Sequence, residues 1–165
     1  MPETMWTPWR LGYVVGEKPE GCFFCLKSQE PPEKDKENYI LHRSKTCFIM
    51  LNSFPYTNGH LMVAPYAHRA SPELLEPEVL HELIDLTGLS VAILRRAIAP
   101  EGFNIGMNLD RVAGAGVADH LHMHVVPRWK GDTNYMSVLA DTRLIPEALN
   151  STYERLSEAL RQTLK

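Results

Sequence analysis

The chain has 165 residues, of which 44% are hydrophobic and 22% charged, so it is long enough for one globular domain with a substantial core. Its formal net charge of −3 gives no support for a nucleic-acid binder that works through bulk positive charge. The start, M-P-E-T-M-W-T-P-W-R, has no basic segment followed by an apolar core, and no run of about 20 apolar residues occurs, so neither a signal peptide nor a membrane span is expected. Three cysteines are too few for a disulfide framework. These properties predict a cytoplasmic protein with no nucleic-acid or membrane partner.

The N-terminal quarter contains an aromatic arm, a cysteine pair and a charged segment. In the arm, residues 1–20, Trp6, Trp9 and Tyr13 follow no period, which predicts packing either on the chain's own core or on a second subunit. The spacing Cys22-x-x-Cys25 alone leaves zinc binding, redox activity and coincidence open. The polar, charged residues 27–38 are predicted to be a mobile surface loop.

Apolar periodicity predicts a mixture of strands and helices in the rest of the chain. Short apolar runs predict strands at 39–42, 47–52, 60–65 and 103–109. A turn at 55–59, which contains Asn58-Gly59, joins the second and third as an antiparallel hairpin with a longer loop. Ser71-Pro72-Glu73 and Pro77 are two candidate starts of a long amphipathic helix that ends before Pro100. A second helix is predicted over 146–164. This order indicates a single α+β domain, 1–165, with a mainly antiparallel sheet of about five strands.

The segment richest in chemistry is Asp119–Trp129, which reads D-H-L-H-M-H-V-V-P-R-W. Its three histidines, His120, His122 and His124, alternate with aliphatic residues, and this period predicts a strand with all three imidazoles on one face. Next-but-one residues of a strand are about 6–7 Å apart, close enough for the imidazoles to meet one phosphate or one metal ion. Pro127 is expected to end the strand because it has no N–H.

A loop of small residues, A-G-A-G-V at 113–117, leads into this strand. Small side chains allow main-chain N–H groups to approach a phosphate closely, and a histidine beside a phosphate can act as nucleophile, acid or charge stabiliser. A site in which all three histidines bind a metal is the alternative that spacing leaves open.

The H-L-H-M-H-V-V motif resembles the signature of the histidine triad superfamily of nucleotide hydrolases and transferases. The stretches L-N-S-F-P-Y-T-N-G-H-L-M-V-A-P-Y-A-H and N-L-D-R-V-A-G-A-G-V-A-D-H are similar to the same family, and W-T-P-W-R with P-R-W-K-G-D-T-N-Y is similar to its branch of diadenosine tetraphosphate phosphorylases. The resemblance covers roughly residues 6–135. It implies a homodimer with the α+β fold of the histidine triad family. Such a protein cleaves dinucleoside polyphosphates through a nucleotidyl-histidine, and inorganic phosphate or water then accepts the nucleotidyl group.

The resemblance also implies a role for each matching residue. His122 corresponds to the nucleophile, His120 and His124 to residues that contact the phosphate or hold the geometry, and His60 to a histidine that positions the triad. The substrate contacts that it implies, or that the loop and its surroundings suggest, are Asn52 at the ribose, Asn108 at the phosphates, the loop residues Gly114, Ala115, Gly116 and Val117, and Trp129 at the wall of the nucleotide site. No metal is required for this chemistry.

Two further expectations follow from the resemblance. Some family members bind structural zinc through a cysteine pair and two histidines, which here correspond to Cys22, Cys25, His68 and His120. His42 is the alternative to His68 as the third ligand. Diadenosine triphosphate hydrolases carry Gly-Gln-Ser/Thr-Val before the triad, whereas this chain has Ala115-Gly116-Val117-Ala118. We expect the missing glutamine side chain to leave space for inorganic phosphate as acceptor. Hydrolysis of the same substrates or of adenosine phosphoramidates, and a nucleotide-binding sensor or scaffold, are the alternatives.

Overall fold

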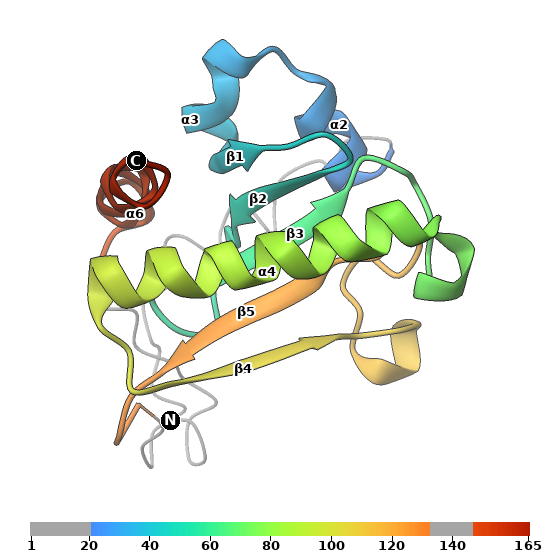
Figure 1. Cartoon of the computed structure of the whole chain (residues 1–165). Coiled ribbons are helices and arrows are strands. Elements are labelled where there is room, and N and C mark those ends of the chain that lie inside the picture. Colours follow the sequence, from blue (N-terminus) through green and yellow to red (C-terminus); the bar gives the residue numbers. More distant parts are fainter. Residues whose placement is uncertain (1–20, 133–146) are drawn as a thin grey trace, which may run out of the picture.

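Five strands form one antiparallel sheet in the order β1-β2-β3-β5-β4 (Figure 1). The computed structural model describes residues 21–132 and 147–165, so the aromatic arm lies outside the described residues. The strands are β1 Ile40–Arg43, β2 Cys47–Leu51, β3 Leu61–Pro65, β4 Gly102–Met107 and β5 Met123–Arg128. The α+β sheet of five strands is therefore confirmed, and so is the β2–β3 hairpin, in which Ile49 pairs with Val63.

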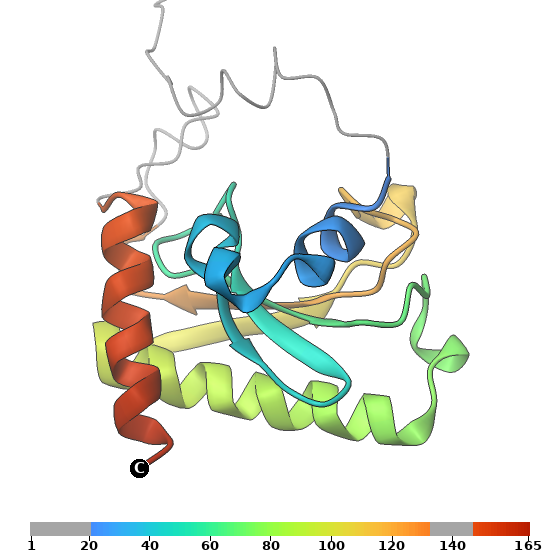
Figure 2. The same ribbon diagram turned by 90° about the horizontal axis from the view of Figure 1, so that it is seen from above.

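Three main helices cover the two faces and one end of this sheet. They are α2 Phe23–Gln29, α4 Pro77–Ile98 and α6 Leu149–Thr163, with short helical turns at η1 Pro32–Lys34, α3 Asp35–Asn38, η2 Pro72–Leu74 and η3 Arg111–Ala113. Figure 2 shows α4 on one face of the sheet and α2 with α3 on the other. Within the described ranges, no helix is long and apolar enough to cross a bilayer.

The alternation of each strand divides the core into two layers. The larger cluster contains Leu121, Met123 and Val125, together with Ile49 and Val63. It also includes buried residues of α4 and α6. Phe48, Met50 and Met62 face the other way and form a smaller cluster with Phe24 of α2. His120, His122 and His124 alternate with Leu121, Met123 and Val125, so they face the other way. The ring of Phe24 in α2 contacts His120 and His122, which places the histidines on the face that α2 covers.

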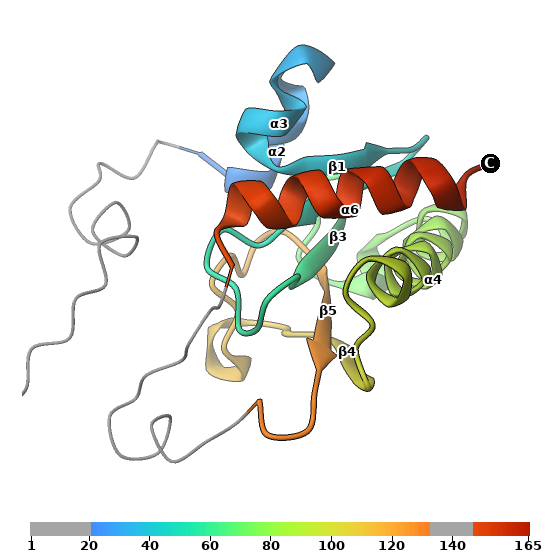
Figure 3. The same cartoon turned by 90° about the vertical axis from the view of Figure 1, so that its left-hand side faces the viewer.

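Helix α6 closes one end of the sheet (Figure 3). Leu156 and Leu160 are buried against the larger cluster, as the helical pattern predicted. The Tyr153 hydroxyl donates to the carbonyl of Ile40 at 3.0 Å, and Thr152 donates to Asn58 at 3.1 Å. These bonds attach the C-terminal helix to β1 and to the turn that precedes His60.

The segment 27–38 differs from its expected form, because most of it is helical rather than a loop. Its order comes from polar contacts that apolar periodicity does not reveal. The Arg43 guanidinium donates to the carbonyls of Ser28 and Glu30 and pairs with Asp35 at 2.7 Å. Asn38 is buried and donates to Glu30 at 2.5 Å.

Two boundaries also differ. The strand β5 begins at Met123, so His120 and His122 precede it, and it continues through Pro127 to Arg128. Pairing with β3 stops at Val125, so only β4 flanks the strand at Pro127, where a missing N–H is tolerated. The long helix begins at Pro77, the second of the two candidate starts, and the first forms only the short turn η2.

Candidate functional site

Four histidines from two strands and their flanks form a buried row under α2. The exposed fractions are 1% for His60, 1% for His120, 5% for His122 and 9% for His124. Met62 of β3 pairs with His124, and this register brings His60, just before β3, beside the triad. Burial of a polar ring without a partner is costly, so the partners of each nitrogen determine what the row can do.

The hydrogen bonds fix the proton positions of His60 and His124. The main-chain N–H of Tyr56 can only donate, and it lies 3.1 Å from Nδ1 of His60, which therefore accepts. The Nε2–H of neutral His60 then donates to Nδ1 of His124 at 2.9 Å. Neutral His124 consequently keeps its own proton on Nε2, where it can donate to a ligand.

His122 has the opposite arrangement. Its Nδ1 lies 2.9 Å from the carbonyl oxygen of His120, and a carbonyl can only accept, so this nitrogen carries the proton. The lone pair is then on Nε2. A neutral imidazole with an unprotonated Nε2 is the form required of a nucleophile.

Burial keeps these imidazoles neutral. It lowers the pKa of His122 and of His120 below the ordinary value for histidine. It also lowers the pKa of His124 from 6.5 to about 4, with a smaller contribution from repulsion by His122. Near neutral pH His120, His122 and His124 therefore offer lone pairs and N–H donors without a fixed positive charge.

His120 belongs to a second cluster, with Cys22, Cys25 and His68. The ligand atoms of the four residues lie within 4.8 Å of one another, and Nδ1 of His120 is 3.2 Å from Sγ of Cys22 and 3.5 Å from Sγ of Cys25. The Nε2–H of His120 donates to the carbonyl of Pro65 at 2.8 Å, which leaves Nδ1 unprotonated. His42, on β1, is not part of the cluster, so the structure places His68 rather than His42 beside the two cysteines.

The small-residue loop uses some of its own amides. The N–H groups of Gly114 and Ala115 donate to the carbonyls of Arg111 and Asp110, at 3.0 and 3.3 Å. These two amides are therefore engaged within the loop, whereas those of Gly116 and Val117 make no main-chain bond within the described residues. A Cβ atom added at Gly116 would meet nothing within 4 Å, so the missing side chain does leave open space.

The remaining expected contacts are spread around the row. Asn52 lies beside the row: its amide nitrogen is 3.4 Å from Nδ1 of His60, and its oxygen accepts from the N–H of Phe54. Asn108 is half-buried just after β4. Trp129 is half-buried just after β5. The substrate-binding roles of these residues stay predictions.

Sequence reasoning missed two residues beside the triad. Gly106 of the edge strand β4 pairs with His124, and a Cβ atom there would meet nothing within 4 Å, so the β4 side of His124 is open. The ring of Tyr56 stacks near His124, with centroids 5.7 Å apart. The strand pattern of F-N-I-G-M-N-L could have indicated Gly106, but only the register of β4 against β5 places it opposite His124.

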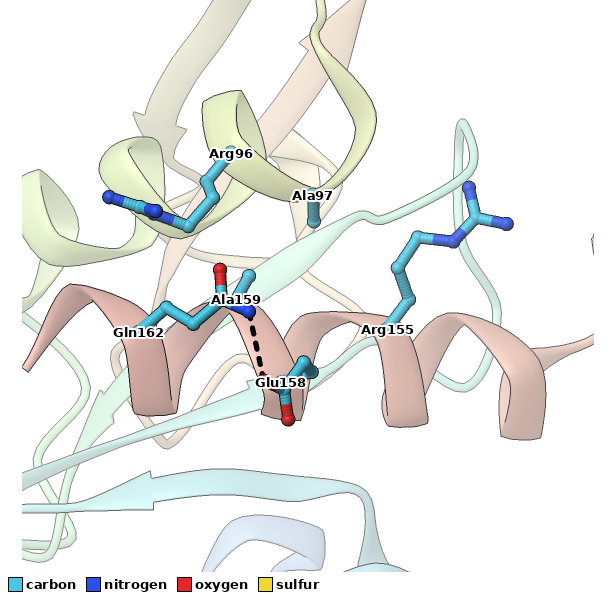
Figure 4. Close-up of a pocket in the computed structure, with 6 residues that line it drawn as sticks. All are labelled: Arg96, Ala97, Arg155, Glu158, Ala159 and Gln162. Atoms are coloured by element: carbon cyan, nitrogen blue, oxygen red, sulfur yellow. Dashed lines mark hydrogen bonds between the residues drawn. The ribbon is translucent and has the colours of Figure 1, made fainter.

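A surface cavity between α4 and α6 contains none of these residues (Figure 4). Arg96 and Ala97 of α4 line it together with residues of α6, among which Gln162 donates to Glu158 at 2.9 Å. It lies where the two helices meet, on the α4 side of the sheet, whereas the histidines lie on the α2 side. This cavity is therefore separate from the histidine row under α2.

An antiparallel sheet with a row of alternating histidines defines the class of protein to which this chain belongs. Residues 33–131 match the model of the HIT domain, and the chain belongs to the HIT family. It is 34% identical over 161 residues to a Mycobacterium tuberculosis protein named AP-4-A phosphorylase, with 94% of this chain and 83% of that protein covered.

Two further relatives support the same assignment. The adenosine 5'-monophosphoramidase hnt1 of Schizosaccharomyces pombe is 26% identical over 142 residues, which cover 85% of this chain and 98% of that protein. A crystal structure of a Zn-bound histidine triad family protein from Mycobacterium smegmatis aligns with a TM-score of 0.68 and 26% identity, over 87% of this chain and 95% of that one. Nucleotide-processing enzymes are thus among the matched relatives.

Acidification is expected to destabilise the fold through His124. The unfolded chain takes up a proton at this histidine near pH 6.5, whereas the folded chain takes it up only near pH 4. Stability that is fully present above pH 6.5 is therefore lost as the pH falls toward 4, by up to about 1.4 kcal/mol per pH unit for this group. Denaturant unfolding of His124→Asn across this range should show a shallower pH slope than wild type. The matched control His81→Asn, at an exposed position of α4, should keep the wild-type slope, and equal slopes in both variants would contradict the assignment.

Proposed function

We propose that this chain cleaves dinucleoside polyphosphates by nucleotidyl transfer to His122, with inorganic phosphate as the preferred acceptor. The observation that carries the proposal is the hydrogen bond from Nδ1 of His122 to the His120 carbonyl, which leaves the Nε2 lone pair available inside a row of neutral imidazoles. The similarity to the named phosphorylase supports the choice of substrate and acceptor.

The proposed reaction has two displacements. In the first, Nε2 of His122 forms a bond to the α-phosphorus of diadenosine tetraphosphate, the bond from that phosphorus to its bridging oxygen breaks, and ATP leaves. In the second, an oxygen of inorganic phosphate attacks the same phosphorus, the bond to nitrogen breaks, and ADP is released. The covalent intermediate divides one difficult step into two easier ones.

Other residues of the row have supporting roles in this proposal. The Nε2–H of His124 donates to a phosphate oxygen, and His60 maintains that proton position through its bond to Nδ1. The amides of Gly116 and Val117 stabilise charge that develops on the phosphate, since donors fixed in advance cost no rearrangement during the reaction. The open space at Gly116 accommodates the acceptor.

The test is product analysis with diadenosine tetraphosphate, with and without inorganic phosphate. We expect ADP and ATP to form only when phosphate is present. His122→Asn should lower kcat by at least about 10³-fold while nucleotide affinity is kept, because the variant loses the nucleophile but keeps the pocket. The control His81→Asn makes the same change at an exposed site and should retain turnover.

Each alternative gives a different result. AMP and ATP in amounts independent of phosphate would make the chain a hydrolase and overturn the role of Gly116. No turnover of dinucleoside polyphosphates, combined with release of AMP from an adenosine phosphoramidate, would replace the substrate class. A sensor or scaffold would show neither reaction, and its partner binding would survive His122→Asn.

We also propose that Cys22, Cys25, His68 and His120 bind a structural zinc ion. A tetrahedral zinc site with sulfur and nitrogen ligands places the ligand atoms about 3.3–3.8 Å apart, and the distances from Sγ of Cys25 to Nδ1 of His68 and His120, 3.4 and 3.5 Å, fit this range. The bond from His120 to Pro65 is the outer contact that typically fixes a metal-binding imidazole. Four protein ligands close such a site, so zinc would supply structural support there.

Metal analysis of the purified protein tests this assignment. We expect about one zinc ion per chain in the wild type and almost none in Cys25→Ser, together with a lower melting temperature for the variant. The control Cys47→Val changes the buried cysteine on the opposite face of the sheet and should keep its zinc. Equal zinc contents in Cys25→Ser and wild type would refute the site.

We further propose that two copies of the chain form a homodimer in which the edge strand β4 of each copy lies at the interface. Within residues 21–132 and 147–165 this strand pairs only with β5, and Ile105 is 48% exposed. The nearby Leu109 and Val112 are also exposed, which adds apolar surface suited to a second copy. Sedimentation of wild type and Ile105→Lys should show a dimer that the charged residue weakens, and a monomeric wild type would exclude it.

A further inference from the structure

The helix α2 places an aromatic ring between the metal cluster and the proposed nucleophile. Phe24 stands between Cys22 and Cys25 in the sequence and is 1% exposed. Its ring centroid is 5.0 Å from that of His120 and 4.7 Å from that of His122, with an interplanar angle of 38° in both cases. One buried ring therefore packs on both imidazoles.

The position of the His122 ring needs such a contact. The torsion that rotates an imidazole about its bond to Cβ is broad and roughly twofold, so rotamer preference alone does not choose between the two ring orientations. Only one of these orientations lets Nδ1–H donate to the His120 carbonyl. A half-turn would place a carbon atom against that carbonyl, and the Nε2 lone pair would no longer be in its place.

We propose that Phe24 is a positioning residue for the His122 imidazole, and that the cysteine and histidine cluster anchors it. The activity part of this inference rests on the proposed function. The bond to the His120 carbonyl chooses between the two orientations, and the tilted ring of Phe24 hinders the His122 ring from leaving the plane in which that bond forms, which preserves the direction of the lone pair. A misplacement of about 1 Å at a reacting group can lower a rate about 10²-fold, so this packing matters for the rate rather than for the affinity.

The anchor follows from the size of α2. It has seven residues and no side-chain bond at its N-cap, and a helix of this length is not stable by itself. Cys22 and Cys25 on either side of Phe24 contact the ring nitrogens of His120 and His68. A metal ion held by these four residues would fix α2, and hence the ring of Phe24, relative to the triad.

The matched pair Phe24→Leu and Phe48→Leu tests the proposal. Both changes remove a fully buried ring from the same apolar cluster. Phe48 stacks on Tyr66 and lies near Phe24, and among the described residues it has no ring contact with a histidine. A general loss of packing would therefore affect both variants, whereas a loss of positioning affects only Phe24→Leu.

Two measurements separate the possible results. We expect Phe24→Leu to slow formation of the nucleotidyl-enzyme by roughly 10–100-fold with little change in KM, and Phe48→Leu to react at nearly the wild-type rate. Nitrogen-15 NMR should show the hydrogen-bonded Nδ1–H of His122 in wild type and Phe48→Leu but not in Phe24→Leu. Removal of zinc from wild type with a chelator should weaken the same signal.

Equal behaviour of the two variants, or a change in KM alone, would overturn the role of Phe24. An unchanged His122 signal after zinc removal would overturn the anchoring role of the cluster. If Phe24→Leu does not fold, Phe24→Met retains more volume without the flat ring and takes its place. A wild type that forms no nucleotidyl-enzyme would refute the proposed function, and the NMR comparison would still test the role of Phe24.

Discussion

The need to give each buried imidazole a hydrogen-bond partner constrains the whole arrangement around the site. Four histidines lie on the α2 face or beside it, where an unsatisfied nitrogen would be costly. Each partner comes from a different part of the fold: the carbonyl of Pro65 ends β3, the N–H of Tyr56 belongs to the loop before it, and the carbonyl of His120 precedes β5. The sheet, the loop and the histidine segment must therefore all assemble before every imidazole of the row is satisfied.

The same constraint gives chemically identical side chains different roles. His122 donates from Nδ1 and His124 accepts there, so one presents a lone pair and the other a proton at Nε2. Neither role follows from the residue type. The main chain assigns them, since carbonyl and amide groups have fixed hydrogen-bonding roles whereas imidazole does not.

Much of this site could be predicted from the sequence, because the period of two in H-L-H-M-H-V-V states which side chains share a face. The partners of those side chains could not be predicted in the same way. The bond between His60 and His124 depends on the register of β3 against β5, and the choice of His68 over His42 depends on where the turn after β3 leads. The helical form of 27–38 was missed because Arg43 and buried Asn38, not apolar periodicity, hold it in place.

The neutrality of His124 has a thermodynamic consequence for ligand binding. A polyphosphate that enters the site brings negative charge next to an imidazole whose pKa is only about 4 in the empty protein, and this charge raises that pKa. At a pH between the two pKa values, binding is then accompanied by proton uptake from the solution. The heat measured by calorimetry will contain the ionisation enthalpy of the buffer, so titrations in phosphate-free buffers of different ionisation enthalpy will give different apparent enthalpies for the same complex. The slope of that dependence counts the net protons taken up when the complex forms.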